Sequence, residues 1–226
     1  MKLPSILSAP LGLLLGALFF ATPAMADDAK PAAQPALPTF VSPDITKDPQ
    51  DVLLLDLSNG GRVAIRLMPQ WAPNHVERIK TLTRQKFYDG IVFHRVIEGF
   101  MAQTGDPTGT GGGGSPLPDL KAEFNAMPHL RGTVSAARTN EPDTANSQFF
   151  IVFYPRFALD RKYTVFGRVI SGMEVVDRIE RGEPPANPTR IVRASLAADS
   201  EPQPMATAPA EDAPVSLSDL ENSKSD

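Results

Sequence analysis

Short apolar runs, several of them alternating with polar residues, recur along the middle of the chain and predict a mainly β fold. Runs of four to eight residues rich in β-branched and aromatic side chains, bounded by Gly, Pro, Asn or Asp, are typical of strands. Eight such segments lie at residues 52–57, 62–67, 91–97, 100–104, 132–138, 147–153, 163–170 and 189–195. The first two flank Ser58-Asn59-Gly60-Gly61, and Asn-Gly is a strong signal for an antiparallel hairpin.

Only two segments have the periodicity of a helix. In residues 72–85, Val76, Ile79 and Leu82 recur on one helical face, and Pro73 is tolerated in the first turn. A second, shorter helix is predicted at residues 173–180, directly after a glycine.

Eight strands with two helices exclude a doubly wound parallel sheet, which needs a helix between most of its strands. A sheet that closes on itself has no unpaired edges. The pattern therefore predicts a closed eight-stranded antiparallel β-barrel capped by two α-helices.

The first 26 residues have the pattern of a secretory signal peptide. Lys2 precedes an apolar run over about residues 6–21, and Ala24-Met25-Ala26 supplies a small-x-small cleavage site before Asp27. The run is shorter than the roughly 20 residues of a membrane-spanning helix. We expect export with cleavage, and no membrane association after it.

The segments on either side of the predicted domain differ from it in composition. Residues 27–50 are dense in Pro and Ala and predict an extended linker rather than a packed element. Residues 198–226 are acidic and poor in large apolar side chains, which predicts a disordered tail. Residues 51–197 remain as one domain of ordinary size.

Composition narrows the chemistry. With 22 basic and 26 acidic residues, the chain has a formal net charge of −4, which argues against nucleic acid as a partner. The absence of Cys excludes disulfides, thiolate catalysis and Cys-ligated zinc.

The glycine-rich stretch at residues 105–120 contains G-x-G-x-x-G at Gly109, Gly111 and Gly114. That motif holds a dinucleotide only where a helix begins directly behind it. Here Pro116 and Pro118 follow, and neither suits a helix interior. The stretch is expected to be a loop, and no cofactor is predicted.

The three histidines do not predict a metal site, because none stands at metal-ligand spacing to another or to a pair of carboxylates. His75 lies near the exposed start of the first predicted helix and is expected to face solvent. His129 lies in a loop-like segment. No G-x-S-x-G motif supports a Ser–His–Asp hydrolase.

Arg95 is unusual because it lies within the apolar segment FHRVIEGFMAQTGD, residues 93–106. Strand alternation places Phe93, Arg95 and Ile97 on one face and His94 and Val96 on the other. Arg95 could face water, form half of a core ion pair, or point into an apolar cleft.

The residues near Arg95 favour the cleft without excluding the other interpretations. Phe100, Met101 and Gln103 follow it, and a later strand supplies Gln148, Phe149 and Phe150. Aromatic, thioether and amide side chains around one cation are typical of an apolar pocket edged with donors. An ordinary barrel core with a surface arginine is the alternative.

These same residues resemble the cyclophilins, a family of peptidyl-prolyl cis–trans isomerases. The resemblance covers roughly residues 51–197 and rests on three ordered signatures, at Phe93–Asp106, at Ser147-Gln148-Phe149-Phe150-Ile151, and at Leu159-Asp160 with Val165-Phe166-Gly167. It implies an isomerase of X–Pro bonds in client polypeptides, working without metal or cofactor, with a non-catalytic proline-binding module or chaperone as the alternative.

Matching positions imply roles for particular residues. Arg95 would be the catalytic cation that stabilises the twisted amide. The residues that would bind or support the substrate are His94, Phe100, Met101, Gln103, Ala137, Arg138, Gln148, Phe150, Leu159 and Tyr163.

Two positions depart from the family pattern. Ala158 stands where eukaryotic members often have a Trp that contributes to cyclosporin affinity, so weak inhibition is expected. Tyr163 stands where many members have His. The signal and the bacterial style of the motifs imply a bacterial periplasm, with full secretion as the alternative. A monomer is expected.

Overall fold

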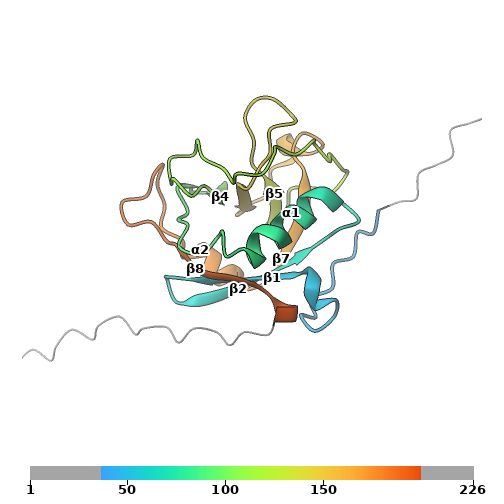
Figure 1. Ribbon diagram of the computed structural model, residues 1–226, viewed down its shortest axis with the longest axis horizontal. Coiled ribbons are helices and arrows are strands. Elements are labelled where there is room, and N and C mark those ends of the chain that lie inside the picture. The colour runs from blue at the N-terminus through green and yellow to red at the C-terminus, as the bar shows by residue number, and fades with distance from the viewer. Residues whose placement is uncertain (1–36, 200–226) are drawn as a thin grey trace, which may run out of the picture. The chain divides into compact units, whose positions relative to one another are not determined.

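A single curled antiparallel sheet of eight strands dominates the computed structural model, which describes residues 37–199 (Figure 1). The predicted mainly β fold with two helices is therefore confirmed. The predicted signal peptide and nearly all of the predicted tail lie outside the described residues. The strands are β1 (Val52–Leu57), β2 (Gly61–Leu67), β3 (Arg95–Ile97), β4 (Met101–Thr104), β5 (Thr133–Ala136), β6 (Phe149–Val152), β7 (Val165–Ser171) and β8 (Ile191–Leu196).

The predicted hairpin joins β1 to β2, and the order of the strands across the sheet is β3-β4-β6-β5-β7-β2-β1-β8. Gly60 has a φ of 77°, a left-handed conformation that glycine adopts without strain. Its amide donates to the carbonyl oxygen of Leu57 at 3.1 Å and closes the turn.

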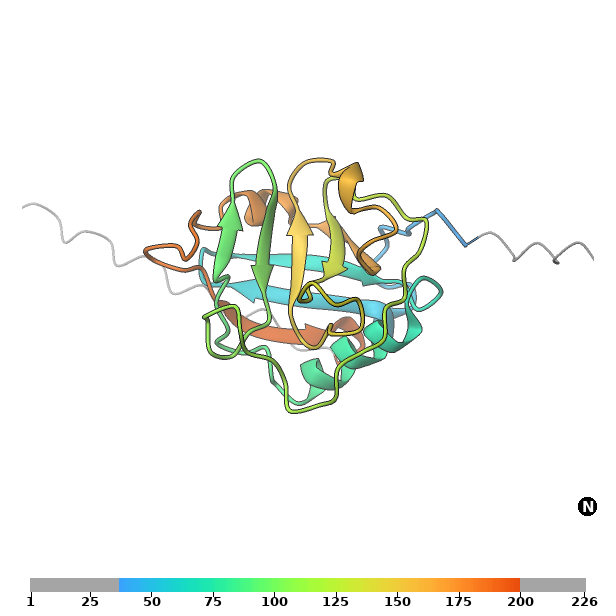
Figure 2. The ribbon, with the colours of Figure 1, turned by 90° about the horizontal axis from the view of Figure 1, so that it is seen from above.

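The sheet curls so that β3, β4, β6 and β5 run across β2 and β1 (Figure 2). Its two end strands, β3 and β8, do not pair with each other along their length. The chain just before each of them meets at one bridge, Val92 to Arg190, where the Phe93 amide donates to the Thr189 carbonyl oxygen at 2.8 Å. The expected closed barrel is thus not found as one continuous ladder, because β3 is short and begins only beyond this bridge.

Alternation along the strands directs one set of side chains into the main core and the other set to the opposite face of the sheet. Val96, Ala102, Ile151 and Val134 are successive register partners from β3 to β5, and all belong to the main core. Phe93 is also buried in this core, so its predicted place on the face of Arg95 is wrong. The alternation fails there because residues 92 and 93 bond to the segment before β8 instead of continuing β3.

Helix α1 (Pro73–Arg84) packs against β8 and β7, and the predicted apolar positions Val76, Ile79 and Leu82 are buried. Helix α2 (Met173–Asp177) is shorter than predicted and packs on β2. No helix within residues 37–199 is long and apolar enough to cross a membrane.

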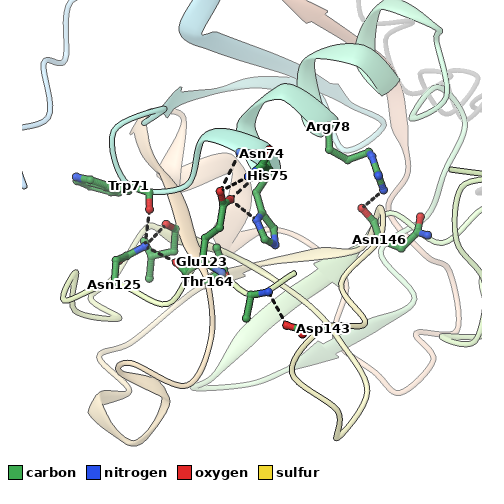
Figure 3. A network of polar contacts seen from close by, with 11 residues as sticks. Trp71, Asn74, His75, Arg78, Glu123, Asn125, Asp143, Asn146 and Thr164 are labelled. Carbon is green, nitrogen blue, oxygen red and sulfur yellow. Dashed lines mark hydrogen bonds and ion pairs between the residues drawn. The ribbon is translucent and has the colours of Figure 1, made fainter. Parts of the chain in front are cut away.

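The start of α1 is held by a carboxylate from a distant loop (Figure 3). Glu123 accepts the backbone amides of Asn74 and His75, at 3.1 and 3.0 Å, and contacts Nδ1 of His75 at 2.6 Å. The free amides of a first helical turn favour an anion in this position. His75 is therefore buried and paired, and the expectation that it faces solvent is wrong. Burial lowers the pKa of His75, against the opposing effect of Glu123.

Residues 37–50, here termed the N-terminal strap, pack against the sheet. The indole Nε1 of Trp71 donates to the carbonyl oxygen of Pro38 at 2.8 Å, and Leu37 and Val41 pack against the cluster around Trp71. The buried guanidinium of Arg66 donates to four strap carbonyl oxygens, those of Ser42, Asp44, Lys47 and Asp48. The expectation of an unpacked linker is therefore wrong for this part of residues 27–50.

Replacing Arg66 by Met is expected to release the strap. Hydrogen bonds to a charged group contribute about 1.5–3 kcal/mol each, so the free energy of unfolding should fall by at least about 2 kcal/mol. Trypsin should then cleave faster after Lys47, as followed by mass spectrometry. Arg168→Met is the matched control, because Arg168 is the register partner of Arg66 but donates to Arg131 rather than to the strap. Equal cleavage rates in the two variants would contradict the anchoring role.

Candidate active site

One row of side chains crosses four strands on the face opposite the main core. Arg95 of β3 is the register partner of Gln103 of β4, Gln103 is the partner of Phe150 of β6, and Phe150 is the partner of Ser135 of β5. Register partners in antiparallel strands point to the same side of the sheet and have neighbouring Cβ atoms. Three of the predicted site residues are therefore brought together by register alone.

A cavity of about 240 Å³ opens beside this row. This is below the roughly 300–1,000 Å³ of pockets for drug-sized ligands, so it suits a single ring-sized group. Its lining combines apolar and aromatic side chains with one carboxamide and two guanidinium groups, and all lining residues are predicted site residues: Arg95, Phe100, Met101, Gln103, Ala137, Arg138, Phe150, Leu159 and Tyr163.

Arg95 is one of the two cations that line the cavity. Its side chain is 43% exposed, and its Nε donates to Oε2 of Glu183 at 2.8 Å. Among residues 37–199, its other guanidinium N–H groups have no hydrogen-bond partner. Of the three interpretations of Arg95, a core ion pair is excluded, and a half-exposed cation facing an apolar cleft is what the geometry shows.

Gln103 is oriented by Gln148. Nε2 of Gln148 donates to the carbonyl oxygens of Gly113 and Gly111, at 2.7 and 2.9 Å, so its Oε1 is left to accept from Nε2 of Gln103 at 2.8 Å. Within residues 37–199, Oε1 of Gln103 has no hydrogen-bond partner, so it can accept an N–H. Gln148 itself does not line the small cavity, and it acts on the cavity by fixing the orientation of the Gln103 side chain.

Phe150 forms a wall of the cavity and is itself held on two sides. Its ring stacks on the His129 imidazole, with centroids 6.3 Å apart and planes at 17°, and meets the ring of Tyr163 edge-on at 5.8 Å. The guanidinium carbon of Arg138 lies 4.5 Å from the centre of the Tyr163 ring. Such ring contacts add stability beyond the area they bury and fix the position of Phe150.

Behind Phe150, a buried hydrogen-bonded chain joins Ser135, His129 and Asp160. Nδ1 of His129 is 2.8 Å from Oδ1 of Asp160, and its Nε2 is 2.9 Å from the hydroxyl of Ser135. A carboxylate acceptor at Nδ1 leaves Nε2 to accept the Ser135 proton, and burial lowers the pKa of His129 although Asp160 opposes it. Ser135 has no exposed surface and does not line the cavity, so the chain supports Phe150 rather than supplying a nucleophile.

The structure does not bring His94 into this cavity. Its ring is buried, neither ring nitrogen has a hydrogen-bond partner in the described part of the chain, and burial lowers its pKa. It lies against the glycine-rich loop, where a Cβ on Gly111 would be 3.7 Å from its Nε2. Unlike the His94 ring, the backbone amide of Ala137 has a partner: it donates to the carbonyl oxygen of Gln148 at 3.0 Å.

The glycine-rich stretch is a loop, as predicted, and it is organised by Asp106. The carboxylate of Asp106 accepts from the amide and hydroxyl of Thr108, both at 2.8 Å, and from the amides of Thr110 and Gly111, at 3.0 and 2.6 Å. Burial raises the pKa of Asp106, but the donors of Thr108 and of the glycine amides outweigh it and lower the pKa to about 2. The loop lines a second cavity of about 460 Å³ that shares Gln103, Ala137 and Arg138 with the first.

Replacing Asp106 by Asn is expected to lower the free energy of unfolding at pH 7 by about 2 kcal/mol, the linkage value for a carboxylate whose pKa is near 2 when folded and near 4 when unfolded. Because the folded pKa is the lower one, this stability is present above pH 4 and is lost as the pH falls towards 2. Urea unfolding of both proteins across that range should show a flatter pH dependence for the variant. Equal slopes for wild type and Asp106→Asn would refute this prediction.

Within residues 37–199, no three His, Asp or Glu side chains gather in a way that would hold a metal ion. The site therefore combines two guanidinium groups, two carboxamides and a ring-sized cavity on the outer face of a curled antiparallel sheet, and register places Arg95, Gln103 and Phe150 side by side. This combination agrees with the resemblance to the cyclophilins.

Comparison with known sequences agrees. Residues 53–196 match the family described as "Cyclophilin type peptidyl-prolyl cis-trans isomerase/CLD". A protein of Brucella suis named "Probable peptidyl-prolyl cis-trans isomerase" is 45% identical over 170 residues, which cover 68% of this chain and 86% of that protein. The chain belongs to the cyclophilin-type peptidyl-prolyl cis–trans isomerases, and its predicted assignment to this family is confirmed.

Solved structures show the same fold. A cyclophilin named AquaCyp293 from Hirschia baltica is 32% identical with a TM-score of 0.63, over 69% of this chain and 77% of that one. A Cryptosporidium parvum cyclophilin-type isomerase, crystallised in the presence of the dipeptide Ala-Pro, is 26% identical with a TM-score of 0.60, over 64% of this chain and 98% of that one.

Two parts of the site escaped the sequence reasoning. Glu183 contacts Arg95 from a segment that carries none of the three signatures. The sequence predicts only a loop at His129, although Asp160, which orients the His129 ring, lies within the third signature. No local pattern marks either residue, because both act through partners distant in sequence.

Proposed function

We propose that this isomerase accelerates rotation about X–Pro bonds of client polypeptides in the 240 Å³ cavity, with Arg95 as the catalytic cation. The observation that carries the proposal is the row Arg95–Gln103–Phe150, which places a cation, an amide and an aromatic wall around one ring-sized space. The Ala-Pro dipeptide named for the C. parvum neighbour supports proline-containing chains as the substrate class.

The reaction is a rotation about the X–Pro bond, and no covalent bond forms or breaks. An X–Pro bond resists rotation because the nitrogen lone pair is delocalised into the carbonyl, and uncatalysed exchange takes about 10–100 s. In the twisted state this delocalisation is lost, and the nitrogen becomes a better hydrogen-bond acceptor. A donor placed at that nitrogen, or at the neighbouring carbonyl oxygen, stabilises the twisted state more than either planar state.

The residues of the cavity match these requirements. The apolar walls, Phe150 and Met101 among them, would hold the prolyl ring while the chain before it turns. The free N–H groups of Arg95 would donate to the twisted amide, and Oε1 of Gln103 would accept a peptide N–H. Arg suits this role because its charge is permanent and its donors are held in a rigid plane.

The test is a protease-coupled isomerisation assay on a short Ala-Pro peptide. Acceleration well above the uncatalysed rate, saturable in peptide, is expected. Binding of the peptide without acceleration would replace this proposal by the alternative of a non-catalytic binding module.

Export to a bacterial periplasm is a further part of the proposal, and it rests on the pattern of residues 1–26. Expression in a Gram-negative host, followed by fractionation and mass spectrometry, should recover a periplasmic chain that begins at Asp27. Recovery of the full-length chain in the cytoplasm would refute it.

A further inference from the structure

The guanidinium of Arg95 is bound through Nε to one carboxylate. Glu183 lies in the segment between α2 and β8, 88 residues further along the chain, and its Oε2 accepts from Nε of Arg95 at 2.8 Å. The Glu183 side chain is 50% exposed, and it does not line the cavity. It therefore meets the proposed catalytic cation without occupying space that a substrate would fill.

The segment that carries Glu183 is fastened to the strand that carries Arg95. The amide of Val96 donates to the carbonyl oxygen of Gly182 at 2.8 Å, and the amide of Gly182 donates to the carbonyl oxygen of Val96 at 2.9 Å. This reciprocal pair lies one residue from each member of the ion pair, so Glu183 and Arg95 are held in register by backbone bonds.

The turn around Gly182 is also tight. Gly182 has a φ of 147° and bridges to Pro185, and a Cβ at Gly182 would lie 2.5 Å from Cα of Pro185. No other residue fits there without moving the turn. The position of Glu183 is thus set by local backbone geometry and not only by its attraction to Arg95.

A bond at Nε has a specific effect on an arginine. The guanidinium is planar and carries five N–H donors, one on Nε and four on the two Nη atoms. Holding Nε–H against a fixed carboxylate restricts rotation of the plane and leaves the four Nη–H donors available. We propose that Glu183 is a positioning residue, which holds the Arg95 guanidinium in the orientation that the twisted amide requires. This inference rests on the catalytic role proposed for Arg95.

A nearby ion pair gives the matched control. Arg131 and Asp177 are joined at 2.6 Å, with side chains 41% and 42% exposed, close to the 43% and 50% of Arg95 and Glu183. Neither Arg131 nor Asp177 lines the cavity. Exposed ion pairs contribute little to stability, so removing either carboxylate should leave the protein folded.

The experiment compares Glu183→Ala, Glu183→Gln and Asp177→Ala in the protease-coupled assay. Glu183→Ala should lower kcat about tenfold, because a catalytic group misplaced by an ångström loses rate steeply, while KM changes little. Glu183→Gln should recover most of the rate, since its amide oxygen still accepts from Nε. Asp177→Ala should match wild type. Wild-type kcat in Glu183→Ala, a Gln variant as slow as the Ala variant, or an equal loss in Asp177→Ala would each overturn the proposal.

A second measurement reports on orientation directly. The Nε–Hε signal of Arg95, assigned by its absence in Arg95→Lys, should exchange slowly with solvent in wild type and fast in Glu183→Ala. Unchanged exchange would overturn the positioning role. Arg95→Ala separates the two levels of inference: if it keeps full activity, the role proposed for Arg95 fails, whereas inactive Arg95→Ala with fully active Glu183→Ala removes only the role of Glu183.

Discussion

Replacing Arg95 by Ala is expected to lower kcat/KM for X–Pro isomerisation by about 10²–10³-fold, the usual effect of removing one preorganised donor from a developing charge. The loss should fall mainly on kcat, since the guanidinium interacts more strongly with the twisted amide than with the planar one. The apolar walls that hold the prolyl ring remain in place, so KM should change much less. The protease-coupled assay on an Ala-Pro peptide measures both constants.

The fold should survive this change. The Arg95 side chain is 43% exposed and its one ion pair is at the surface, so the free energy of unfolding should change by no more than about 1 kcal/mol. Arg95→Lys keeps the charge but loses the planar fork, and it should recover only part of the rate. Arg131→Ala removes a similarly exposed arginine that is also paired with a carboxylate but does not line the cavity, and it should leave kcat unchanged. Wild-type kcat/KM in a folded Arg95→Ala protein would refute the proposed mechanism.

Replacing Phe150 by Ala is expected to impair both stability and substrate binding. The side chain is 5% exposed and packs between His129 and Tyr163, so its removal should lower the free energy of unfolding by about 3–5 kcal/mol. It also removes a wall of the cavity that would hold the prolyl ring, so KM should rise in the molecules that stay folded. Urea unfolding and steady-state kinetics below the unfolding transition separate the two effects.

The adjacent residue provides the control for Phe150. Phe149 points to the other side of β6, into the main core between Tyr88 and Phe166, and lines no part of the cavity, so its expected place beside the cleft is wrong. Phe149→Ala should destabilise the protein to a similar degree while leaving KM unchanged. If either Ala variant fails to fold, Phe149→Leu and Phe150→Leu make the same comparison more mildly. A rise in KM for the core variant equal to that for the cavity variant would contradict the assignment of Phe150.

The part of the site that could be predicted from the sequence is the part governed by period-two alternation and by the family signatures. Gln103 and Phe150 share the face of Arg95 because short antiparallel strands fix which side each residue points to. Alternation failed at Phe93 because this residue precedes β3 and its backbone amide donates to the carbonyl oxygen of Thr189. The strand type was predictable at this point, but its first residue was not.

The features that could not be predicted depend on polar partners far along the chain. His75 reads as a surface residue of a helix until Glu123, 48 residues away, supplies the carboxylate that makes its burial tolerable. The contact between Arg95 and Glu183 spans 88 residues. Period and propensity are properties of neighbouring residues, and they contain no information about which distant loop will approach a given side chain.

The N-terminal strap determines how this domain can be cut out of the chain or transferred to another protein. The segment shared with the family starts at residue 53, whereas the carbonyl oxygens that accept from Arg66 and Trp71 belong to residues 38–48. A chain cut at the family boundary would keep a buried guanidinium and an indole N–H but lose the acceptors of both. The folded domain therefore extends upstream of the residues that match the family, and a graft of this domain onto another protein would have to carry the N-terminal strap with it.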